Sequence, residues 1–158
     1  MLNFWVVVDA VIYSMCFVAA VFLYSRFKRT SSSRLYAFAA AWALILGLLI
    51  GLAGLGHTLA VTATHVSSRS PYDFRFAWLL VTGLLLIFSG AANVIVSRSI
   101  GRGSRWALWV SASATVLLLG FVAALYPLRR DIDLVVIYGS FLGLLVVALV
   151  HGARHRRV

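Results

Sequence analysis

Residues 35–66, LYAFAAAWALILGLLIGLAGLGHTLAVTATHV, are the stretch of sequence that decides the fold. The stretch has no lysine, arginine, aspartate or glutamate, and it exceeds the ~20 apolar residues that cross a bilayer as one helix. A polar run with two of the four histidines, His57 and His65, closes it. We therefore predict a central membrane helix, with close-packing positions in its middle and any chemistry near its far end.

The composition of the whole chain extends this prediction. Of 158 residues, 63% are hydrophobic and 11% are charged, whereas a soluble domain carries about 25% charged residues. We expect residues 1–158 to form a single transmembrane domain with no separate soluble part. The fold class is an all-α integral membrane protein, built as one bundle of five transmembrane helices, at about residues 4–24, 35–62, 74–96, 106–126 and 134–150.

Two features mark the ends of these spans. The serines of residues 31–33 precede the second span, where a serine hydroxyl can cap the new helix. Pro127 follows the fourth span, and proline disrupts a helix interior because it has no N–H group. We therefore expect the fourth helix to end before Pro127.

Basic residues alternate between the two sides of the five predicted spans. One side carries ten of them and no acidic residue: Arg26, Lys28, Arg29, Arg34, Arg98, Arg102, Arg105, Arg154, Arg156 and Arg157. The positive-inside rule then predicts an N-out/C-in orientation, and we expect a bacterial inner (plasma) membrane. The net charge of +10 is explained by loops that meet anionic headgroups, so the expected partner is the lipid bilayer and not nucleic acid.

Small residues four apart recur in three spans and predict close helix packing. They are Gly47 and Gly51 in the second span, Gly139 and Gly143 in the fifth, and Gly120 with Ala124 in the fourth. Because lipid provides no hydrophobic driving force for helix association, a close approach of two backbones matters more in a membrane. We expect a tight contact between some of these helices, within the bundle or across a homodimer.

Polar residues at the predicted outer end are the candidates for ligand, proton or metal handling. Ionisable groups inside a membrane are costly and are functional candidates by default. Asp9 and His57 are expected at similar depth, where they could pair to bind a metal or relay protons, or each could reach water by itself. His65, Asp73 and Arg75 lie at the same end and would complete a polar outer cluster. His57 and His65 are ~12 Å apart along a straight helix, too far to share one metal ion.

Other residues give no catalytic signature. The single cysteine, Cys16, excludes a disulfide within the chain and a dithiol centre. His151 and His155 share a helical face among arginines, so we expect a solvated tail there. Neither G-x-S-x-G nor H-E-x-x-H occurs. We therefore predict no catalytic residue and identify no cofactor, and we expect Asn93 to hydrogen-bond to a neighbouring helix.

Three function classes remain open. The leading one is a non-enzymatic accessory or scaffold subunit of a larger membrane complex or homo-oligomer, held by glycine-lined helix faces. The alternative is a transporter or sensor that handles a small ligand, proton or metal through Asp9 and His57. The third is a lipid-modifying membrane enzyme with His57 or His65 as its base.

Overall fold

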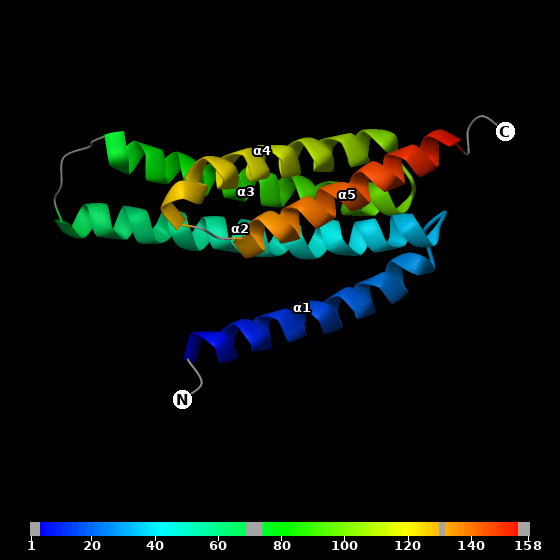
Figure 1. The fold of residues 1–158 in the computed structure, drawn as a ribbon, viewed down its shortest axis with the longest axis horizontal. Helices are drawn as coiled ribbons and strands as arrows, with labels where there is room; N and C mark the ends of the chain where they lie inside the picture. Colours follow the sequence, from blue (N-terminus) through cyan, green and yellow to red (C-terminus); the bar gives the residue numbers. More distant parts are fainter. Residues whose placement is uncertain (1–3, 69–73, 130–131, 155–158) are drawn as a thin grey trace.

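Five helices account for nearly all of the chain that the computed structural model describes, which is residues 4–68, 74–129 and 132–154, with side chains over 14–67, 76–121 and 135–153. In chain order they are α1 (Phe4–Lys28), α2 (Arg34–Ser68), α3 (Phe74–Gly101), α4 (Arg105–Arg129) and α5 (Ile132–Arg154) (Figure 1). These ranges contain no strand, which confirms the all-helical fold class. Within the described residues, three helical segments are long and apolar enough to cross a membrane: Arg34–Ser67, Phe76–Gly101 and Val135–Ala153.

The serine cap predicted before the second span is confirmed. Ser33 directly precedes α2, and its Oγ accepts a hydrogen bond from the backbone N–H of Tyr36 at 3.3 Å. This bond satisfies one of the N–H groups that the first turn of a helix leaves without an intrahelical partner. The sequence therefore fixes this helix start within one residue.

The predicted end of the fourth helix is wrong. α4 continues through Pro127 to Arg129. A proline removes one backbone hydrogen bond and its ring crowds the preceding turn, but only Leu128 and Arg129 of the helix follow Pro127, so a bend there redirects little of the chain. The last turn of α4 therefore accommodates it.

The turn between α3 and α4 requires glycine. Gly103 has a φ of +77°, a left-handed conformation that strains any residue with a Cβ atom. The N–H of Gly103 donates to the carbonyl of Ile100 at 2.8 Å, and the N–H of Ser104 donates to that of Ser99 at 3.0 Å. This pair of bonds is the Schellman motif, which closes a helix and reverses the chain.

The helices differ in how closely they join the bundle. α2 and α3 form an antiparallel pair with the most extensive contact in the molecule, and α4 and α5 pack against it. α1 contacts α2 near the turn that links them and diverges from it toward the N-terminus (Figure 1). The α2–α3 pair extends beyond α4 and α5 at the end away from the basic turns (Figure 1).

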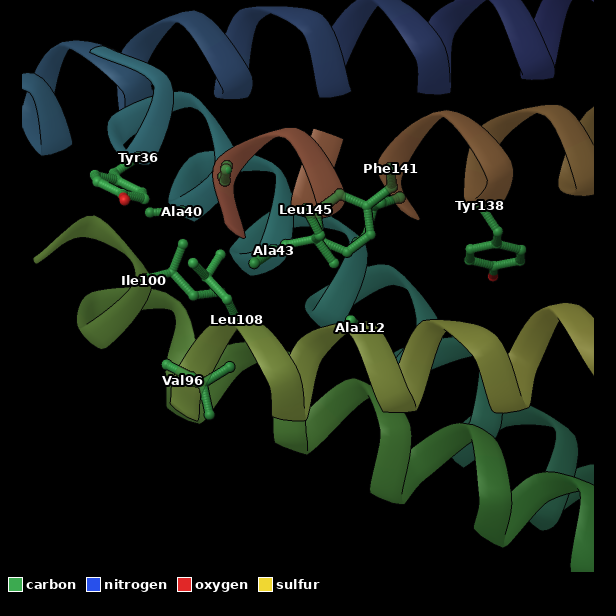
Figure 2. Packing of buried hydrophobic residues seen from close by; sticks show 14 of the residues in the cluster. Tyr36, Ala40, Ala43, Val96, Ile100, Leu108, Ala112, Tyr138, Phe141 and Leu145 are labelled. Carbon is green, nitrogen blue, oxygen red and sulfur yellow. The ribbon is translucent and has the colours of Figure 1, made fainter. Parts of the chain in front are cut away.

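The core lies near the end of the bundle that carries the basic turns. It brings together the first half of α2, the end of α3, the first part of α4 and the middle of α5 (Figure 2). In α2, Ala37, Ala39, Ala40 and Ala43 are fully buried. Alanine side chains let neighbouring helices approach closely, so large residues such as Ile100, Leu108 and Leu145 fill the space against them.

Candidate functional site

His57, the central residue of the predicted outer cluster, joins α2 to α3. Its Nε2 lies 3.0 Å from the carbonyl oxygen of Leu79, and a carbonyl only accepts, so the ring N–H donates. Gly83 makes room for this contact, because a Cβ there would lie 3.2 Å from Cδ2 of His57 and against Oγ1 of Thr58. The imidazole is half-buried and serves a helix–helix contact.

The remaining polar side chains at this end of α2 also make contacts within the hairpin. The ring of His65 stacks on that of Phe76, with centroids 4.0 Å apart and planes inclined by 29°. Thr58 and Thr62 donate to the carbonyls of Gly54 and Thr58 in their own helix, each at 2.8 Å. A hydroxyl that donates to a carbonyl in the preceding turn meets its hydrogen-bonding requirement within its own helix.

Three predicted members of the outer cluster fall where the structure describes no side chain. Asp9 belongs to α1 and Arg75 to α3, but their side chains, like the whole of Asp73, lie outside the described residues. The helix that carries Asp9 diverges from α2 toward its N-terminal end (Figure 1). Among the described side chains, no group of three or more histidine, cysteine, aspartate or glutamate residues could hold a metal ion.

The glycines of the second span meet glycines in α3. A Cβ at Gly47 would lie 2.8 Å from the carbonyl oxygen of Gly90, and one at Gly54 would lie 2.8 Å from that of Gly83. Gly90 itself lies against the backbone of Gly51. The sequence reasoning missed Gly83 and Gly90, because they are seven residues apart and match no four-residue pattern. A spacing of seven is two helical turns, so it places both on one face and could have identified them.

The other predicted packing glycines face outward. A Cβ at Gly120, Gly139 or Gly143 would meet no atom within 4 Å. On the opposite side of α5, Tyr138 and Leu145 are buried in the core. The glycines of α5 therefore lie on its outer face.

Asn93 bridges α3 and α4, as predicted from its place in the third span. Its Oδ1 accepts a hydrogen bond from Oγ of Ser111, and its Nδ2 donates to the carbonyl of Ser89 at 3.1 Å. Thr115 donates to the carbonyl of Ser111 at 2.8 Å. All four residues are buried, and a buried polar network of this kind fixes the register of two helices.

An apolar groove opens between α1, α2 and α5. It encloses about 420 Å³, and its lining includes Cys16 from α1, Phe38, Trp42 and Leu49 from α2, and Ile137 and Ser140 from α5. Its volume falls in the roughly 300–1,000 Å³ range of small-molecule pockets. Sequence reasoning assigned Cys16 no role, and nothing in a single helix indicates a space formed by three.

His151 is part of the packed end of the molecule, which differs from the solvated tail expected there. Its ring lies edge-on to that of Tyr36, with centroids 5.9 Å apart, and it is half-buried. His155, its predicted partner, lies outside the described residues.

No family model, curated protein or solved structure matches this chain. The function is therefore inferred from the residues and their geometry.

Proposed function

We propose that the protein is an accessory or scaffold subunit of a membrane complex or homo-oligomer. In this proposal all five helices cross a bacterial inner membrane as one bundle, with the basic turns on the inner side. Three segments of membrane-spanning length and the alternation of basic loops support this arrangement.

The outer face of α5 is the observation that carries the proposal. Gly139 and Gly143 face open space, and the exposed side chains of Val146 and Val150 continue the same stripe. Elsewhere in this chain, at Gly47 and Gly90, the same residue type lets two helix backbones touch. α5 thus presents outward the kind of surface that α2 and α3 use on each other, and a transmembrane helix of another subunit would fit it.

The polar residues at the opposite end of the bundle are compatible with a structural role. His57 bonds to a backbone carbonyl of α3, and His65 stacks on Phe76. Both rings stabilise the α2–α3 hairpin. A subunit whose role is to bind other subunits needs a rigid hairpin of this kind and needs no catalytic side chain.

Cysteine crosslinking in native membranes tests the proposal. With Cys16 replaced by alanine, Val146→Cys places one thiol on the outer face of α5. Ile95→Cys is the matched control, because Ile95 is 74% exposed at a comparable distance from its helix end but belongs to α3. We expect oxidation to link Val146→Cys to a second copy or to a partner cysteine that mass spectrometry identifies. Monomer alone in both variants would contradict the subunit role.

Reporter fusions test the orientation independently. A fluorescent protein that folds only in the cytoplasm, fused after Val158, should fluoresce. Alkaline phosphatase, active only outside the cytoplasm, should be inactive at the same position. The opposite pair of results would reverse the proposed orientation.

A further inference from the structure

The groove between α1, α2 and α5 has the depth of one membrane leaflet. Along α2 its lining runs from Phe38 to Leu49, eleven residues or ~16 Å at 1.5 Å per residue. One leaflet of hydrocarbon is about half of the ~30 Å bilayer core. The groove therefore matches a single acyl chain in length, and its apolar lining matches that chain in chemistry.

One end of the groove is strongly basic. α1 ends and α2 begins there, and the side chains of Arg26, Lys28, Arg29 and Arg34 are all exposed. Arg34 is one turn before Phe38, so these charges lie at the level where the apolar lining ends. The apolar groove therefore has a cluster of cations at one end.

The stretch of sequence that carries these cations contains no acidic residue. The four acidic residues of the chain are Asp9, Asp73, Asp131 and Asp133. Asp9 is seventeen residues before Arg26 on the same helix, about 25 Å away, and residues 10–72 contain no other acidic group. This local excess of positive charge would attract an anionic group of a lipid.

Aromatic rings lie at the basic end of the groove and continue into it. The ring of Tyr24 lies edge-on to that of Phe38 with centroids 6.3 Å apart, and Phe38 lies edge-on to Trp42 at 6.2 Å. Tyrosine and tryptophan favour the membrane–water interface. Tyr24 and Phe38 would therefore lie where a lipid changes from headgroup to chain. Trp42 lies deeper, about 12 Å past Arg34 along α2.

We propose that this groove is a binding site for an anionic phospholipid. One acyl chain fills the groove against Trp42 and Ser140, and the phosphate is bound by the basic residues at the α1–α2 turn. The site lies beside the core on α5 and does not include Gly139 or Gly143. It needs the protein to be in a bilayer but does not depend on the subunit role.

Quenching of a single tryptophan by brominated lipid tests the site. In the full chain, Trp5, Trp78, Trp106 and Trp109 are replaced by phenylalanine, which leaves Trp42 in the groove. The protein is reconstituted in phosphatidylcholine vesicles that contain a small fraction of acyl-brominated phosphatidylglycerol or, in parallel, brominated phosphatidylcholine. A matched chain that keeps only Trp109, which is 63% exposed on α4, reports the lipid around the protein in general.

We expect brominated phosphatidylglycerol to quench Trp42 more than brominated phosphatidylcholine does, with equal quenching of Trp109 by the two lipids. Arg34→Gln should lower the preference at Trp42 about fivefold, the effect of one basic residue near a membrane surface. Ser140→Phe should fill the groove and reduce quenching of Trp42 by both lipids.

Three results would overturn the site. They are equal quenching of Trp42 by both lipids, the same preference at Trp109 as at Trp42, and full preference in Ser140→Phe. Native mass spectrometry of the unsubstituted protein gives a second reading that needs no variant. From a mixture of the two lipids, it should retain one phosphatidylglycerol, and retention of both lipids in their mixing ratio would contradict the proposal.

Discussion

Gly90 of α3 lies directly against the backbone of Gly51 in α2. A Cβ at Gly90 would lie 2.7 Å from Cα of Gly51 and 2.6 Å from the carbonyl oxygen of Gly47. In the reverse direction, a Cβ at Gly51 has its nearest neighbour, Cα of Gly90, at 3.9 Å, which is ordinary contact. The two glycines share one interface but do not tolerate the same substitutions.

Gly90→Ala should therefore destabilise the protein, and Gly51→Ala should not. The methyl group at Gly90 meets backbone that cannot move aside, and overpacking of this kind costs about 1–3 kcal/mol. At Gly51 the added methyl group fits, and the higher helix propensity of alanine contributes up to ~1 kcal/mol. Thermal unfolding in one detergent, followed by circular dichroism, measures both. Equal losses of stability would contradict this asymmetry.

The hydrogen bond between Asn93 and Ser111 should couple α3 to α4. A double-mutant cycle with Asn93→Ala and Ser111→Ala isolates the bond, because the residues lie on different helices and contact each other directly. We expect a coupling energy of about 0.6 kcal/mol, the average for hydrogen bonds between membrane helices, and no more than ~1.7 kcal/mol.

Thr82 provides the control for that cycle. Its hydroxyl donates only to the carbonyl of Trp78 in its own helix, at 2.9 Å, so Thr82→Val combined with Ser111→Ala should give no coupling. A coupling energy near zero for Asn93 and Ser111 would show that α3 and α4 are held by packing alone.

Ser33→Ala should destabilise the start of α2. The substitution removes the acceptor for the N–H of Tyr36, and loss of a helix cap costs about 1 kcal/mol. Ser33→Asp should restore stability because its carboxylate accepts the same bond, and Ser32→Ala should have little effect. Unfolding midpoints of the three variants decide the matter, and a loss in Ser33→Asp equal to that in Ser33→Ala would rule out capping.

His57→Ala tests whether the imidazole is structural or functional. If it only joins the helices, the variant should lose about 0.6–1.7 kcal/mol of stability and still pair with its partner subunits. Thr62→Val, which alters an exposed hydroxyl bonded within α2, should lose almost nothing. A His57→Ala protein of unchanged stability that no longer binds a metal ion or transports protons would instead favour the ligand-handling function, and Asp9→Asn should then have the same effect.

The helices could be predicted from sequence because each is a long apolar run bounded by polar residues. Ser33 marked a helix start correctly, since a cap depends on neighbours in the sequence. Pro127 did not end its helix, because a bend so close to the C-terminal end redirects only the two residues that follow it. A helix start that depends on neighbouring residues, such as the one at Ser33, could be predicted. The helix end at Pro127 could not, because the effect of a proline depends on where it lies in the helix.

The contacts between helices were less accessible from sequence. Gly47 and Gly51 were recognised by spacing, but their partner Gly90 was not, because its companion Gly83 lies seven residues away. His57 stood out as a polar residue in an apolar span, yet its partner is a backbone carbonyl, a group that every residue carries. The groove is a property of three helices at once, and no single run of sequence encodes it.

The length of α2 has a consequence for its place in the membrane. At 35 residues, the helix is ~52 Å long, more than the 40–45 Å of a bilayer with its headgroups. A lone helix longer than the bilayer can fit by tilting. α2 cannot tilt alone, because its backbone touches that of α3 at Gly90, so the two helices must tilt together or extend past the headgroups. The α2–α3 pair should therefore place its far end, which carries His57 and His65, in or beyond the headgroups of one leaflet.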